Sequence, residues 1–121
     1  MRLDLHARYT HRNKESVVPA YVLTHLTVTD PEGFARFSQG VPPLTQRHRG
    51  RLLVADAAAK PLEGGYADGL TIVVEFPSAA DAQAWYDSVE YQELSVLRRA
   101  ATETHSMVIL HATPEVFRGD S

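Results

Sequence analysis

The sequence predicts an α+β domain with elements in the order strand, helix, strand, strand, helix, strand. One observation is that β-branched and aliphatic residues gather in four short segments, residues 20–28, 51–55, 70–76 and 107–111. A second is that apolar residues recur at helical spacing in the two longer segments between them. This order is the split β-α-β arrangement, which gives a four-stranded antiparallel sheet with its helices on one face.

Residues 20–28 are predicted to form the first strand because they are rich in β-branched residues and partly alternate with polar ones. A helix then begins at Asp30-Pro31, an N-cap acceptor followed by proline at the first helical position. Its apolar face continues through two adjacent prolines, so we expect one kinked or restarted helix rather than two unrelated segments. The residues of that face are Phe34, Phe37, Val41 and Leu44.

The second and third strands are predicted at residues 51–55 and 70–76, on either side of a loop that carries Pro61 and Gly64. Pro77 ends the third strand, because proline has no N–H to donate to a strand ladder.

The second helical region opens with Ser78-Ala-Ala-Asp81, which resembles a capping box with Asp in place of Glu. Its first half has a predicted buried face of Ala82, Trp85 and Val89. A turn near Ser88 leads into a second set of residues at helical spacing. This set is Tyr91, Leu94, Leu97 and Ala101.

We expect three parts along the chain of 121 residues, of which only the middle one is a folded domain. Residues 1–18 form a basic extension that is either an edge or partner-swapped strand or a mobile segment. Residues 19–112 form the α/β domain, and residues 113–121 form a tail with little to bury.

The composition argues against several classes of function. A formal charge of −3, with no basic stripe, disfavours nucleic acid as a partner. The absence of cysteine removes disulfides and a cysteine nucleophile. No run reaches the roughly 18 apolar residues of a membrane span, and the first residues, with Asp4, lack the apolar core of a signal peptide. We therefore expect a cytoplasmic protein with no membrane partner.

The predicted sheet leaves one apolar face without helices to cover it. A second copy of the chain is the natural cover, so we expect a homodimer whose sheets pack face to face.

Several short motifs, in their order along residues 19–111, resemble the DUF1330 family. They are Ala20-Tyr21, Thr29-Asp30-Pro31-Glu32 with Phe34, His48-Arg49-Gly50-Arg51, Leu62-Glu63-Gly64, Glu75-Phe76-Pro77-Ser78 and Trp85-Tyr-Asp-Ser-Val-Glu-Tyr-Gln92.

The resemblance implies a ferredoxin-like dimeric α/β-barrel, the broad group of antibiotic-biosynthesis monooxygenases, muconolactone isomerases and relatives of chlorite dismutase. It implies no reaction, because the family's function is unassigned. The chain departs from the family pattern at Val89, where proline is common, and in its basic N-terminal extension.

Four residues are candidates for catalysis. His48 continues the apolar stripe of the first helix, where an imidazole can shuttle protons or simply cap the last helical turn. Arg98 has no acid on its own helix, so it either pairs with Glu75 as a structural salt bridge or anchors an anionic ligand. The phenol of Tyr86 can hydrogen-bond a carbonyl or enol oxygen of a substrate, and either Tyr86 or Glu75 would orient that substrate.

Six further residues are candidates for binding a substrate: Trp85, Phe37, Tyr21, Tyr91, Leu94 and His25. The face of the sheet that His25 occupies depends on strand register, because a slip of one residue reverses it. Nothing near His25 supports haem ligation. The histidines show no close metal-ligand spacing, so we expect no metal and no other cofactor.

The leading functional hypothesis is a homodimeric, cofactor-independent enzyme of secondary metabolism. It would act by proton transfer on a carbonyl or enolisable substrate, as an isomerase, cyclase or monooxygenase, and this hypothesis rests on analogy of fold. The alternative is a non-catalytic protein of the same fold that binds a metabolite or a partner. An enclosed pocket lined by both His48 and Arg98 favours catalysis, whereas a filled interior with Arg98 paired to Glu75 opposes it.

Overall fold

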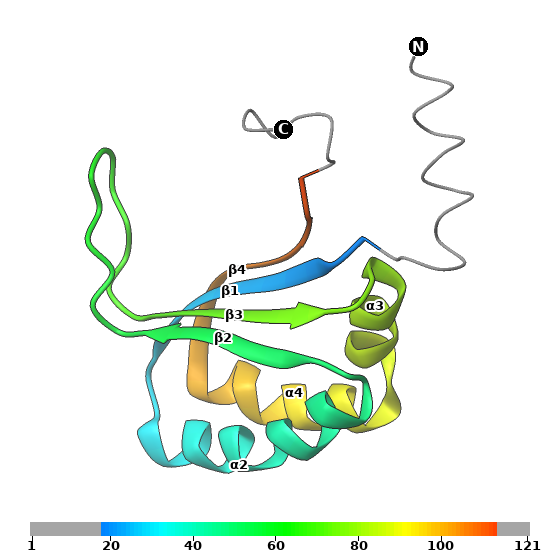
Figure 1. Cartoon of the computed structure of the whole chain (residues 1–121). Helices are drawn as coiled ribbons and strands as arrows, with labels where there is room; N and C mark the ends of the chain where they lie inside the picture. The colour runs from blue at the N-terminus through cyan, green and yellow to red at the C-terminus, as the bar shows by residue number, and fades with distance from the viewer. Residues whose placement is uncertain (1–17, 114–121) are drawn as a thin grey trace.

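The computed structural model describes residues 18–113 of the chain. The predicted order of elements is confirmed, with the second helical region divided into two helices (Figure 1). The predicted extension and C-terminal tail lie outside the described residues, apart from Val18 and Thr113. The elements are β1 (Ala20–Val28), α2 (Pro31–Arg47), β2 (Arg51–Asp56), β3 (Leu70–Phe76), α3 (Ala79–Asp87), α4 (Val89–Ala101) and β4 (Thr102–His111).

The sheet is antiparallel throughout, with the strand order β2-β3-β1-β4 of the ferredoxin-like fold. Alternate residues of β1 point to opposite faces. Val22, opposite Val74, belongs to the core beneath the sheet, so its neighbour Leu23, opposite Val73, lies on the other face. All three helices lie on the core side of the sheet (Figure 1). The opposite face, called the open face below, is not covered by a helix of the described chain.

The helix α2 is continuous from Pro31 to Arg47 and includes both prolines, so the predicted two-part apolar face belongs to one helix. Asp30 occupies the N-cap position as predicted, but its side chain makes no capping hydrogen bond. The backbone N–H groups of Thr29 and Asp30 instead donate to the carbonyl oxygen of Ala101. The start of α2 is thereby joined to the end of α4.

Ser88 divides the second helical region by serving both helices. Its hydroxyl donates to the carbonyl of Trp85 at the end of α3 and accepts from the N–H of Tyr91, 3.1 Å away, at the start of α4. Because a new helix begins here, the helical phase of α3 is lost. The predicted burial of Val89 is therefore wrong, since Val89 is 70% exposed.

The strand β4 starts five residues earlier than the predicted segment at 107–111, because it follows α4 with no loop. A bulge interrupts its pairing with β1 between His25 and Leu26 and leaves His105 without a paired residue opposite it. No helix in the described part of the chain is long and apolar enough to cross a membrane.

Candidate functional site

Aromatic rings from three helices gather beneath the centre of the sheet. Tyr91 is 1% exposed, and its ring centroid lies 4.3 Å from that of Trp85, 5.5 Å from that of Tyr86 and 6.3 Å from that of Phe37. These four predicted site residues are therefore brought together. Leu94 packs against the same cluster, close to Gly40 of α2, where the missing Cβ leaves room for the leucine side chain.

Trp85 joins this cluster to α2 through a buried hydrogen bond. Its Nε1–H donates to Oγ1 of Thr45 over 3.2 Å, and the Thr45 hydroxyl donates to the carbonyl of Val41. Sequence periodicity does not predict that Thr45 is buried, because a polar residue next to Leu44 is expected on the exposed side of the helix. Its burial is explained by the tryptophan that it supports.

Arg98 lies in the last turn of α4, with 4% of its surface exposed. Its Nη1 donates to Oγ1 of Thr104 over 2.8 Å, whereas its Nε has no hydrogen-bond partner. Within residues 18–113 no carboxylate forms an ion pair with it. A buried guanidinium without a carboxylate is costly, because the charge has lost its hydration.

Tyr91 is the titratable neighbour of this charge. Burial raises the pKa of the Tyr91 phenol above its ordinary value, and the positive charge of Arg98 opposes that rise. The phenol therefore stays protonated at neutral pH. Tyr91 can donate a hydrogen bond, but it is a poor base.

Glu75 does not reach Arg98. It accepts a hydrogen bond of 2.8 Å from Arg51 on the neighbouring strand β2, and both residues lie on the open face with Tyr21. The predicted structural pair of Glu75 with Arg98 is thus absent. Glu75 and Tyr21 therefore lie across the sheet from the aromatic cluster.

His48 is the C-cap residue of α2 and is partly buried. Its Nδ1 lies 3.1 Å from the carbonyl oxygen of Leu44, so Nδ1 carries the proton that is donated there. The imidazole thus caps the last turn of α2, one of the two roles that the sequence predicts for it.

His25 is paired with Thr71 of β3, two residues along from the pair of Leu23 and Val73 on the open face. His25 therefore also lies on the open face. Its ring stacks on that of Tyr66, with centroids 3.9 Å apart and planes 2° from parallel. His105 lies beside it at 4.7 Å. The described residues contain no group of three or more ligands placed to hold a metal ion.

A groove of about 440 Å³ separates α2 from the core side of β2 and β3. Most of its walls are aliphatic or aromatic side chains, with polar groups at Ser38, Thr45, Gln46 and Arg51. The apolar walls include Phe37, Val41, Leu52, Ala55, Ile72 and Val74.

A smaller pocket of about 250 Å³ lies between α3 and the edge strand β4. Trp85 and Tyr86 form one wall of it, and Met107 and Ile109 form another. Neither this pocket nor the larger groove is lined by His48 or Arg98. Of the aromatic candidates, Phe37 thus lines the groove and Trp85 and Tyr86 line the smaller pocket, whereas His48 and Arg98 line neither.

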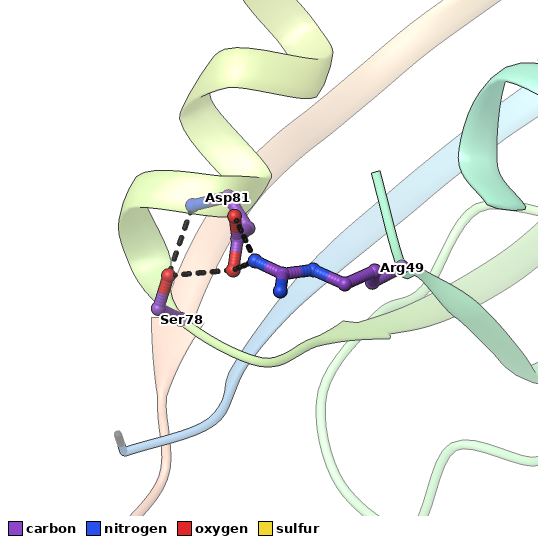
Figure 2. A network of polar contacts seen from close by, with 3 residues as sticks. All are labelled: Arg49, Ser78 and Asp81. Carbon is purple, nitrogen blue, oxygen red and sulfur yellow. Dashed lines mark hydrogen bonds and ion pairs between the residues drawn. The ribbon is translucent and has the colours of Figure 1, made fainter. Parts of the chain in front are cut away.

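A polar network lies just after the C-terminal end of α2, and the sequence did not predict that Arg49 takes part in it (Figure 2). Arg49 has a positive φ of 63°, and its Nη2 donates to both carboxylate oxygens of Asp81, at 3.0 and 3.1 Å. Ser78 accepts from the N–H of Asp81, as the predicted capping box requires, and its hydroxyl donates to the same carboxylate. The network fixes the turn after α2 against the start of α3.

The arrangement next to this network is a shallow polar site. Pro19, Arg49, Arg51 and Glu75 contribute to a pocket of about 470 Å³ at the end of the sheet. Because Arg49 is paired with Asp81 and Arg51 with Glu75, neither cation is left to bind an external anion there.

Comparison with known proteins adds a fold and a family. A solved structure of a protein of unknown function from Rhodopseudomonas palustris superposes with a TM-score of 0.69 at 18% identity, covering 91% of this chain and 92% of that one. A methylated form of that protein gives a TM-score of 0.66 at 19% identity, covering 93% and 92%. No curated protein matches the sequence. The model of a domain of unknown function, DUF1330, matches residues 19–112, and the chain belongs to that family.

Proposed function

We propose that this protein binds a small, largely apolar molecule in the groove between α2 and the sheet, and that it does so as a homodimer. The observation that carries the proposal is the groove itself. Its volume of about 440 Å³ falls within the roughly 300–1,000 Å³ of small-molecule sites, and its walls are mainly apolar with a few polar groups.

Binding rather than catalysis fits the chemistry of these walls. The described side chains that line the groove include hydroxyl and amide groups but no histidine, carboxylate or phenol, and the guanidinium of Arg51 is held by Glu75 on the open face. Proton transfer needs a group with a pKa near the working pH within hydrogen-bond reach of the substrate. The polar groups of the groove can orient a ligand, for example through a carbonyl or hydroxyl oxygen, but they do not take up its proton.

The dimer is supported by an apolar row that crosses the open face. Leu23 of β1 is opposite Val73 of β3 and Val108 of β4, and Val73 is opposite Val54 of β2. All four strands thus place an aliphatic side chain in one line, and Val54 and Val108 are 40% and 43% exposed. A second copy packed on this row would remove it from water.

Binding is tested with an apolar fluorescent anion, anilinonaphthalene sulfonate, on the purified chain. We expect saturable binding at one site per chain. We also expect a change in the fluorescence of Trp85, the only tryptophan, because its N–H is bonded to Thr45 of the groove. Ala55→Phe fills the groove and should abolish both signals, whereas Val96→Phe, on the exposed side of α4, should preserve them. Equal binding by both variants would rule out the groove.

A second candidate function is proton transfer on a carbonyl compound, and one observation favours it. Tyr86 lines the pocket between α3 and β4, where its phenol can meet a bound oxygen atom. The test is deuterium exchange at the α-carbon of a panel of small ketones and 2-oxo acids, followed by NMR. Exchange that Tyr86→Phe removes would support this function, and a wild-type chain that exchanges none of the panel would end it.

A further inference from the structure

The loop between β2 and β3, residues 57–69, stands away from the sheet as a narrow projection (Figure 1). It rises on the open face, the side opposite the helices. Its residues 57–68 are exposed, and Leu62 near its tip is the most exposed large apolar side chain described, at 88%. A leucine this exposed at the end of a projection has no packing partner among residues 18–113.

The base of the loop is nevertheless held firmly to the open face. Tyr66 stacks on His25, and its hydroxyl lies 2.6 Å from that of Thr71. The Nε2–H of His25 donates to the carbonyl of Ala67 over 2.9 Å, and this contact helps to leave His25 only 7% exposed. Stacking and hydrogen bonds of this kind fix the direction in which the loop leaves the sheet.

Thr27 completes the attachment. Its hydroxyl donates to the carbonyl of Asp68 over 2.6 Å. Because the Thr27 hydroxyl proton is used in this bond, Oγ1 of Thr27 can only accept from Nε2 of His105, which lies 2.7 Å away. Three side chains of β1 and β3, those of His25, Thr27 and Thr71, thus hold the end of the loop, and His105 of β4 contacts two of them.

We propose that the β2–β3 loop is an arm that clasps a second copy of the chain, with Leu62 as its anchor. This inference rests on the proposed dimer through the open face. Stacked sheets lie about 10 Å apart. A loop with about six residues on each side can rise to about 20 Å, so its tip would pass the partner's sheet and lie against the partner's outer layer.

A role as an arm also explains why the base of the loop is held to the open face. A loop that only connected β2 and β3 would need no stacked histidine and tyrosine to hold it upright. An arm must be fixed in direction before binding, because ordering it on contact would cost conformational entropy. The same face that the second copy covers is the face to which the arm is fixed.

The test uses single-cysteine variants, because the chain has no cysteine of its own. Leu62→Cys, labelled with a short photo-crosslinker, should give a covalent dimer on irradiation. Val96→Cys, an exposed position on α4, should give none. In addition, Leu62→Ser should raise the dimer dissociation constant at least about tenfold, because two anchors are lost per dimer, and Val96→Ser should leave it unchanged.

The outcomes separate the arm from the dimer. A wild-type chain of monomer mass in sedimentation would overturn the proposed dimer itself, and the arm with it. A wild-type dimer whose dissociation constant is unaffected by Leu62→Ser, and which does not crosslink from position 62, would overturn the arm alone. Circular dichroism of each variant checks that the fold is retained.

Discussion

Replacing Arg98 with methionine tests whether the charge under α4 is compensated within the chain. Methionine keeps a long apolar side chain in the same space and removes the guanidinium. The variant loses the hydrogen bond to Thr104, worth about 1.5–3 kcal/mol for a charged donor. It also removes the unpaired Nε, whose burial costs about 1–3 kcal/mol, so these two contributions nearly cancel.

The desolvation of the charge then decides whether Arg98→Met is more or less stable than the wild type. A buried ion loses several kcal/mol of hydration, and replacing buried ions by apolar residues is often neutral or stabilising by about 1–4 kcal/mol. Because no carboxylate of residues 18–113 pairs with Arg98, we expect Arg98→Met to leave the free energy of unfolding unchanged or to raise it by up to about 3 kcal/mol.

Urea denaturation at pH 7 measures this difference. The matched control is Arg99→Met, an exposed arginine on the same helical turn, which should change the free energy of unfolding by less than about 0.5 kcal/mol. A loss of about 3–5 kcal/mol in Arg98→Met would refute the reasoning, because it is the cost of breaking a compensated buried pair.

The same variant has a second readout in Tyr91. The positive charge of Arg98 opposes the rise that burial causes in the pKa of this phenol. Removing the charge should therefore raise the pKa of Tyr91 further. Ultraviolet titration of tyrosinate should show one phenol ionising at higher pH in Arg98→Met than in the wild type, and an unchanged titration would mean that the two side chains do not interact.

Three further changes test other parts of the structure. Gly69→Ala should lower the free energy of unfolding by about 3 kcal/mol or more, because Gly69 has a φ of 150° and an added Cβ would collide with the carbonyl of Leu26. Thermal unfolding measures this loss. The control Gly65→Ala should show little change, because an added Cβ there meets nothing within 4 Å. Trp85→Phe should cost about 1–3 kcal/mol in urea denaturation through the lost hydrogen bond to Thr45 and looser packing, and no loss would mean that this bond is not formed. Alkaline pH should also destabilise the fold, because burial raises the pKa of Tyr91 in the folded state above the value of 10.0 in the unfolded chain. The contribution of Tyr91 to the free energy of unfolding is therefore complete below pH 10.0 and is lost as the pH rises through the folded-state pKa. Unfolding curves measured between pH 8 and 11 would show this as a falling free energy of unfolding.

The fold could be predicted from the sequence because its signals are local. Proline after Asp30 starts α2, the Ser78 cap starts α3, and the alternation in residues 20–28 defines the central strand. The error at Val89 has the same origin, since a periodic pattern was carried across Ser88, whose hydroxyl ends one helix and starts the next.

The site was harder to predict because it depends on which face each side chain occupies. Burial of Arg98 follows from its spacing after Leu94, but the sequence does not reveal that Glu75 faces the other side of the sheet and pairs with Arg51. That choice is set by strand register, as is the position of His25 under Tyr66. Nor does spacing within one helix show that α2 stands far enough from β2 to leave a groove.

The most direct test of the proposed function is an amide NMR titration of the isotope-labelled chain with anilinonaphthalene sulfonate. The proposal predicts that the perturbed amides cluster around the groove, at Phe37, Val41, Thr45, Leu52 and Ile72. Perturbations confined to the open face around Leu23 and Val73, or to the Tyr86 pocket, would contradict it.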